Sequence, residues 1–363
     1  MEETLHAKEG TVNKKKRVEW LDTLKFIGIY TIFIAHFLDG AGYLYKFACM
    51  YVIQLFFFVS GCFAEKAVKQ QSLPAYIKKQ VKHLLIPYAA FSLINIVLIV
   101  IQENRSIPDI LPLIKQMFFG IRNQLFAPAL WFLPCLFVVS IAYAILLKVG
   151  KKRSIALITS ILIYGLAANF LPFDATETPL WFFNADSALF YLLFYALGAS
   201  TFEVLKKLSE EKTVSFWKSL DKMKQVIMVA AVILGGILVL LPTILTFFGR
   251  LDYFYIYPVF AKVPLLTWLY PIYIAGSIII VNIGIAMWLQ RIPLLSLLGK
   301  NTLAFCGNET IIKTLMVCLL SLFGWNLQIA SPLHAYIYAF ILLILCNYVM
   351  IPIEKKLFPK GII

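Results

Sequence analysis

The residues of this chain that can do chemistry are concentrated in one apolar segment near the N-terminus. Within residues 20–38, which are otherwise almost entirely apolar, stand Asp22, Lys25 and His36, and Asp39 follows directly. On an α-helix, Lys25 and His36 would lie about 20° from a common face and roughly 16 Å apart along the axis. Asp22 and Asp39 extend the same polar stripe. Such a stripe must face protein or water, because charge in contact with hydrocarbon is costly.

The stripe predicts chemistry at two depths of a membrane. Lys25 can hold a phosphate-bearing cofactor near one face. His36, near the other face, can take a proton from a hydroxyl as a neutral imidazole, and Asp39 can orient the ring or stabilise the imidazolium. The alternative is structural: Asp22 and Lys25 extend to the lipid headgroups, and His36 is a hydrogen-bonding residue between packed helices.

A second group of polar residues lies in the apolar run 302–322. Glu309 and Lys313 have the i, i+4 spacing of an intrahelical ion pair, so mutual neutralisation is one interpretation and a second site residue at Glu309 is the other. Asn308 adds hydrogen-bonding capacity beside them. Metal binding is not expected, because the six cysteines are dispersed in apolar segments without metal-ligand spacing.

The composition defines the elements that must position these residues. The chain of 363 residues is 61% hydrophobic and 14% charged, which excludes an ordinary soluble domain. Apolar runs long enough to cross a bilayer as helices occur about ten times. They are Trp20–Leu38, Phe47–Ala64, Leu84–Ile101, Pro128–Leu147, Ser154–Phe170, Ser187–Phe202, Gln225–Leu245, Trp268–Leu289, Thr302–Leu322 and His334–Ile351. The predicted fold class is therefore an all-α polytopic integral membrane protein of about ten transmembrane helices.

The basic residues predict the orientation of this bundle. With the N-terminus inside, 25 Lys and Arg fall in inner segments and six in outer ones, so both termini are expected to be cytoplasmic. The same placement explains the net charge of +14 without nucleic acid. We expect a basic tail over 1–19, a membrane domain over 20–351 and a short tail over 352–363. The apolar piece Ile110–Gly120 is too short to span and predicts an interfacial or re-entrant helix.

Five short motifs, taken in order, resemble the acyltransferase 3 family of polytopic membrane acyltransferases. The resemblance is nearest to sugar O-acetyltransferases of the fucose 4-O-acetylase-like kind. The motifs are Arg17 to Lys25 running on to His36, the Phe-rich segment ending in Ser60-Gly61, the basic loop with Lys79 and Lys82, the segment around Trp131, and Leu298 to Leu303.

The resemblance implies roles for individual residues. His36 would be the catalytic histidine and Lys25 its basic partner, with Lys79 and Lys82 near the acyl donor. Apart from the resemblance, the positions of the residues in the sequence add Arg17 to the acyl-CoA-binding residues and Asp39 and Glu309 to the catalytic ones. A surrounding pocket would include Asp22, Ser60, Trp131 and Asn308. Two departures from the family pattern stand out: Lys replaces Arg at both loop positions, losing its bidentate fork, and Asn308-Glu309 occupies the region where many members place a His.

The resulting prediction is a multi-pass plasma-membrane O-acyltransferase. It would move an acyl group, most simply acetyl, from cytoplasmic acyl-CoA to a hydroxyl of a surface polysaccharide or lipid-linked sugar. The implied partners are acyl-CoA, a sugar or glycolipid acceptor and membrane lipids, with no permanently bound cofactor. The acceptor, the oligomeric state and the choice between direct and covalent transfer stay open. The rival class is a transporter, flippase or polymerase of glycan precursors; a catalytically inactive protein retaining the fold is a third possibility.

Overall fold

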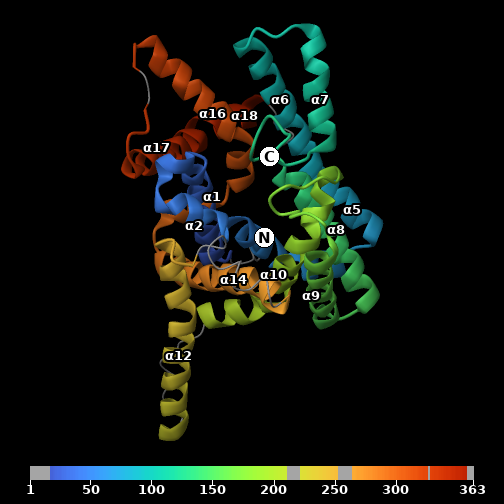
Figure 1. Cartoon of the computed structure of the whole chain (residues 1–363), viewed down its shortest axis with the longest axis vertical. Coiled ribbons are helices and arrows are strands. Elements are labelled where there is room, and N and C mark those ends of the chain that lie inside the picture. The colour runs from blue at the N-terminus through green and yellow to red at the C-terminus, as the bar shows by residue number, and fades with distance from the viewer. Residues whose placement is uncertain (1–16, 211–220, 252–263, 326–327, 358–363) are drawn as a thin grey trace, which may run out of the picture.

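A computed structural model describes residues 17–210, 221–251, 264–325 and 328–357, and every regular element in these ranges is helical. Figure 1 shows α1, α2, α16 and α17 on one side of the molecule and α5 to α9 on the other, with α12 projecting away from the rest. Most of the predicted tails, at 1–16 and 358–363, lies outside the described residues. The α-helices are α1 (Glu19–Ala35), α2 (Tyr43–Cys49), α3 (Val52–Gly61), α4 (Ala64–Lys69), α5 (Leu73–Gln80), α6 (Ile86–Gln102), α7 (Ile110–Phe119), α8 (Phe132–Gly150), α9 (Arg153–Phe170), α10 (Ala185–Glu210), α12 (Lys222–Phe247), α14 (Pro264–Leu289), α15 (Pro293–Gly299), α16 (Thr302–Leu322), α17 (Pro332–Leu345) and α18 (Ile351–Leu357).

Shorter helical segments connect these helices. Three are 3₁₀ turns and two are π-helical segments, which are uncommon and often occur at functional sites. The 3₁₀ turns are η1 (Leu38–Ala41), η3 (Ile107–Asp109) and η4 (Phe182–Asn184), and the π-helical segments are η2 (Val81–Leu85) and η5 (Cys346–Met350).

The described residues contain nearly the number of membrane-spanning helices that the sequence predicts. Within the described residues, eight helical stretches are long and apolar enough to cross a membrane, and the bent pair α2–α3 makes a ninth. The prediction of an unbroken second span is therefore wrong, because the two helices meet at 42°. The first expected span is α1, whose 17 residues give a length of about 25 Å against a hydrocarbon core of about 30 Å.

Helix α1 is short because the chain turns sharply after it and because it is enclosed by protein. Leu38 and Gly42 take positive φ angles of 52° and 61° at the two ends of the turn η1. Most residues of α1 are buried, on every side of the helix. It packs against α3, α14, α15, α16 and α17. A helix surrounded in this way does not have to match the thickness of the lipid.

Glycines let the helices around the site approach one another closely. A Cβ at Gly61 of α3 would lie 1.9 Å from the carbonyl oxygen of Tyr195, and a Cβ at Gly198 of α10 would lie 1.9 Å from that of Phe58. The two positions are reciprocal, as expected where membrane helices pack through small residues. Any larger residue at either position would push α3 and α10 apart.

Close contacts at glycines also position α15 and α16. A Cβ at Gly299, in the motif that ends α15, would lie 1.7 Å from the carbonyl oxygen of Asp22 on α1. A Cβ at Gly307 of α16 would lie 2.3 Å from the ring of Phe91 on α6. These two contacts hold the C-terminal helices against α1 and α6, which is what places the polar residues of α16 beside α1.

Candidate active site

The centre of the candidate site is a contact between α1 and α16. Nδ1 of His36 lies 2.5 Å from Oε1 of Glu309. His36 is the residue at which α1 ends, and its backbone N–H is bonded to the carbonyl of Ile32. Its side chain is 33% exposed while that of Glu309 is 4% exposed. The ring therefore stands at a helix end with one nitrogen fixed to a buried carboxylate.

This contact determines what the imidazole can do. A carboxylate only accepts hydrogen bonds, so Nδ1 of His36 carries the proton that Glu309 receives. Nε2 is then the basic nitrogen, directed away from the carboxylate and able to take a proton from a substrate. A carboxylate, a histidine and a free ring nitrogen form the arrangement of a general base.

Glu309 has a second basic partner. Nζ of Lys313 lies 2.5 Å from the same oxygen, Oε1, and also 4.9 Å from the ring centroid of Phe37 and 5.7 Å from that of Phe33. The intrahelical pair expected from the i, i+4 spacing is thus present together with the His36 contact. The carboxylate of Glu309 therefore contacts both Lys313 and the ring of His36, and its part in the reaction stays a prediction.

The expected partnership of Asp39 with His36 is not what the structure shows. Asp39 lies in the exposed turn η1, and the imidazole nitrogen is bonded to Glu309 instead. The physical reason is the end of the helix at Ala35. Because η1 does not continue α1, the i, i+3 relation that would have stacked Asp39 over His36 does not form.

A second charged cluster occupies the other end of α1. Asp22 is 3% exposed and is bonded to both Arg17 and Lys25. Nζ of Lys25 is 2.7 Å from Oδ1 of Asp22, and the guanidinium of Arg17 contacts both carboxylate oxygens. One carboxylate with two permanent cations leaves a net positive charge, which can attract an anionic group such as a phosphate.

Lys79 and Lys82 lie apart from this cluster in the interactions of the described residues. Lys79 is in the last turn of α5 and Lys82 is in the π-helical segment η2, and both side chains are exposed. No ion pair joins either of them to the Arg17–Asp22–Lys25 cluster within the described ranges. They are free to meet a ligand, but the structure does not show them sharing one with Lys25.

The residues expected to line a pocket have mainly structural contacts. Ser60 donates to the carbonyl of Phe56 at 2.8 Å, within its own helix. Trp131 is 6% exposed. The guanidinium carbon of Arg122 lies over it, 5.0 Å from the centroid of the Trp131 ring. Asn308 is fully buried and donates to the carbonyl of Ala304 at 3.0 Å. Its Oδ1 has no hydrogen-bond partner among the described residues.

Sequence reasoning missed the role of Arg122. Besides covering Trp131, Arg122 donates its backbone N–H to Oδ1 of Asn184 at 2.8 Å, and its side chain donates to the carbonyl of Thr176. Nearby, burial raises the pKa of Glu177, and Arg122 opposes that rise. In the sequence, Arg122 is an isolated basic residue. Its contacts could not be predicted, because its partners lie more than 50 residues away in the sequence.

The described residues contain no group of three or more His, Cys, Asp and Glu side chains that can hold a metal ion. What they do contain are two charged clusters at opposite ends of one buried helix. The chemistry available there is anion binding at one end and proton transfer at the other.

Comparison with known proteins agrees with this arrangement. Residues 18–351 match the acyltransferase 3 family, described as an acyltransferase domain. No curated protein and no solved structure matches the chain significantly. The family match decides between the enzyme and the transporter alternatives, because it covers nearly the whole chain, including every motif and charged-cluster residue named above except Arg17. The chain belongs to the acyltransferase 3 family and is a multi-pass membrane acyltransferase.

Proposed function

We propose that this enzyme transfers an acetyl group from acetyl-CoA to a hydroxyl of a surface polysaccharide or lipid-linked sugar in the plasma membrane. The fucose 4-O-acetylase-like motifs support a sugar acceptor. The observation that carries the proposal is the 2.5 Å contact between Nδ1 of His36 and Oε1 of Glu309. It leaves Nε2 as a base at one end of α1, while the opposite end carries excess positive charge.

The donor is assigned to the end of α1 that carries Arg17 and Lys25. The excess of Lys and Arg in the segments on that side supports a cytoplasmic location, where acyl-CoA is available. The phosphates of CoA would bind the cations, with Lys79 and Lys82 adding positive charge nearby. The thioester would then reach along α1 toward His36.

The chemistry follows from the free nitrogen of His36. Nε2 takes the proton from the acceptor hydroxyl as its oxygen forms a bond to the thioester carbonyl carbon. The carbon–sulfur bond then breaks, and the proton passes from Nε2 to the departing CoA thiolate, so that an ester and free CoA result. In the covalent alternative, Nε2 itself attacks the thioester carbonyl carbon, the carbon–sulfur bond breaks and CoA leaves as the thiolate. The acceptor oxygen then attacks the acyl group on Nε2, the carbon–nitrogen bond breaks, and the hydroxyl proton goes to the CoA thiolate. In both routes Glu309 keeps Nδ1 oriented.

The test uses membranes containing the wild-type protein, His36→Ala or His334→Ala, supplied with radiolabelled acetyl-CoA. His334 is an exposed histidine at the start of α17 and is the matched control. We expect label in a glycan or glycolipid fraction from the wild type and the control only. Label retained on the wild-type protein, and absent from His36→Ala, would favour the covalent route. Equal transfer by His36→Ala would refute the proposal.

A further inference from the structure

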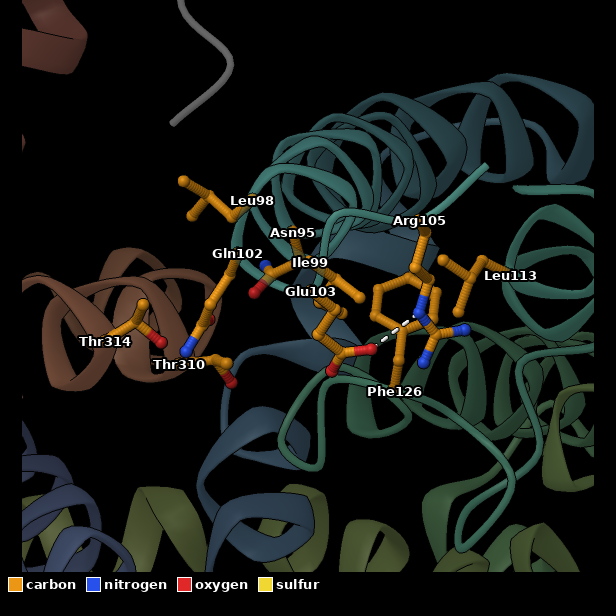
Figure 2. Close-up of a pocket in the computed structure, with 10 residues that line it drawn as sticks. All are labelled: Asn95, Leu98, Ile99, Gln102, Glu103, Arg105, Leu113, Phe126, Thr310 and Thr314. Atoms are coloured by element: carbon orange, nitrogen blue, oxygen red, sulfur yellow. Dashed lines mark hydrogen bonds and ion pairs between the residues drawn. The ribbon is translucent and has the colours of Figure 1, made fainter. Parts of the chain in front are cut away.

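A cavity separate from His36 lies between α6, α7 and α16. Its volume of about 210 Å³ equals that of about seven liquid water molecules at roughly 30 Å³ each. The opening carries Gln102, Glu103 and Arg105, which are exposed, and the interior carries Asn95 and Leu113, which are buried. Figure 2 shows these side chains around the space, with those of α16 opposite those of α6.

The cavity exists because α6 and α16 touch and then diverge. Phe91 of α6 fills the space beside Gly307 of α16. One turn further along each helix, Asn95 and Thr310 stand on opposite sides of the cavity, and Thr314 follows on α16. Helix α7 closes a third side, fixed by the bond from the Tyr88 hydroxyl to the carbonyl of Met117 at 2.6 Å.

An unpartnered polar atom lines this cavity. Asn95 is 1% exposed, and its Nδ2 donates to the carbonyl of Phe91 at 2.8 Å. Its Oδ1 is buried and has no hydrogen-bond partner among the described residues. A buried acceptor left without a partner is costly. Figure 2 shows the amide on the side of the cavity toward Gln102, so that Asn95 forms part of the inner wall of the cavity.

The lining suits a neutral ligand rich in hydroxyl groups. Asparagine, glutamine and threonine side chains both donate and accept hydrogen bonds, as sugar hydroxyls do. The two charged groups at the opening cancel, since Nε of Arg105 lies 2.6 Å from Oε2 of Glu103. Phe126 and Leu98 supply an apolar wall against which the C–H face of a sugar ring can pack. A lipid tail would leave the polar groups unsatisfied.

The cavity is also related to the proposed active site through α16. Thr310 and Thr314 follow Glu309 and Lys313 by one residue each, so the two pairs lie about 100° apart on the same helix. One pair contacts the α1 side and the other lines the cavity. Neither His36 nor Glu309 lines the cavity, so a group bound there is not the one that reacts.

We propose that this cavity is a subsite for a non-reacting sugar of the acceptor. The proposal rests on the proposed function and deepens it. The acceptor would be an oligosaccharide or a lipid-linked oligosaccharide of at least two sugar units, one at His36 and another between α6 and α16. A subsite remote from the reacting atoms strengthens binding in the ground and transition states alike, so its loss raises KM and leaves kcat unchanged.

The kinetic test compares Thr310→Val/Thr314→Val with wild type in the radiolabelled transfer assay, using glycolipid extracted from the host membranes as the acceptor. We expect the KM for acceptor to rise about tenfold, as the loss of two hydrogen bonds implies, with the KM for acetyl-CoA and kcat unchanged. Thr201→Val is the matched control, because Thr201 bonds only within α10, to the carbonyl of Leu197. An unchanged KM for acceptor would overturn the subsite while leaving the transferase intact.

A binding test does not depend on turnover. Thr314→Cys, in a protein with Cys318→Ser, is labelled with a water-soluble maleimide in the presence of methyl fucoside, methyl glucoside, N-acetylglucosamine or lactose. At least one sugar should slow the reaction of the introduced thiol about twofold or more, as half-occupancy requires. Labelling of Cys49, exposed on α2, is the internal reference and should not change. No protection by any of the sugars, or an unreactive thiol at 314, would overturn the proposal.

The two tests separate the possible failures. No transfer by the wild-type protein would remove the proposed function, whatever the sugars do to labelling. Transfer by the wild type together with unchanged acceptor KM and no protection would remove only the subsite.

Discussion

The two ends of helix α1 carry the same arrangement with one difference. At one end the buried carboxylate of Asp22 is bonded to Arg17 and Lys25. At the other, the buried carboxylate of Glu309 is bonded to His36 and Lys313. Each carboxylate has two basic partners, but the first pair is permanently charged, whereas the second contains a histidine, which can gain and lose a proton near neutral pH.

Under the proposed function, that difference separates a site that would hold the donor from a site that would react. The Asp22 cluster combines one carboxylate with two basic side chains, so it suits an anion. The Glu309 cluster is neutral when His36 is neutral and positive when His36 is protonated. In the proposed mechanism, positive charge would therefore appear beside the reacting groups when the hydroxyl has given up its proton, which is when an oxyanion needs stabilisation.

Replacing Glu309 should have the largest effect. Glu309→Gln removes the carboxylate that fixes Nδ1 of His36 and leaves Lys313 without its counter-ion. We expect kcat for acyl transfer to fall by about 100- to 10,000-fold, because the ring loses both its tautomer and its orientation. The measurement is single-turnover transfer in membranes. Glu354→Gln, which alters another buried carboxylate on α18, is the control. An unchanged kcat in Glu309→Gln would remove the distinction between the two ends.

Lys25→Met should change the binding of acyl-CoA without changing the rate of the transfer step. The substitution keeps most of the side-chain volume and removes one of the two cations on Asp22. We expect the KM for acyl-CoA to rise about tenfold with little change in kcat, since a charge-assisted contact contributes more than 1 kcal/mol. Lys115→Met, at an exposed position on α7, should leave both constants alone. A fall in kcat without a change in KM would place Lys25 in the reacting site instead.

A smaller effect is expected from the exposed lysines. Lys79→Ala/Lys82→Ala should raise the KM for acyl-CoA about two- to fivefold at low salt, because solvent-exposed charges interact weakly and are screened. The increase should disappear as salt is added, unlike that of Lys25→Met. The matched pair is Lys355→Ala/Lys356→Ala, also exposed, on α18. Salt-independent loss of affinity would mean that Lys79 and Lys82 are enclosed when the donor binds.

The smallest expected effect is a change in melting temperature on replacing Glu177. Burial raises the pKa of Glu177 above its ordinary value of 4.5. A raised pKa in the folded state favours folding below pH 4.5, and that contribution is lost as the pH rises through the folded-state pKa. Glu177→Gln should therefore melt slightly higher than wild type at neutral pH, and the difference should shrink at pH 4. Glu203→Gln on α10 is the control, and a pH-independent difference would contradict the argument.

Much of the fold could be predicted because membrane-spanning helices are a local property. Long apolar stretches must form helices in lipid whatever surrounds them, and the eight long helices coincide with expected ranges. The end of α1 at Ala35 and the bend between α2 and α3 could not be predicted, because both breaks fall within continuous apolar runs of the sequence.

The candidate site divides in the same way. Asp22 and Lys25 are three residues apart on one helix, so their contact follows from helix geometry. His36 and Glu309 are 273 residues apart, and no local pattern relates them. Asp39 was assigned to His36 only because it was close in sequence. The cavity beside Asn95 could not be predicted from the sequence either, because it depends on how α6 and α16 diverge from the contact between Phe91 and Gly307.

The burial of α1 has a consequence for how the protein assembles in the membrane. The helix is short, carries charged residues at its first turns and is covered by α14, α15, α16 and α17. These neighbours begin more than 200 residues after α1 ends. During synthesis, this short and charged helix is therefore in the membrane before the helices that cover it. Asp22 and Lys25 can already pair at that stage, but Glu309, the partner of His36, has not yet been made. The contact between His36 and Glu309 forms only when the last third of the chain has been inserted. If that contact is catalytic, as proposed, the enzyme becomes active late in its own biogenesis.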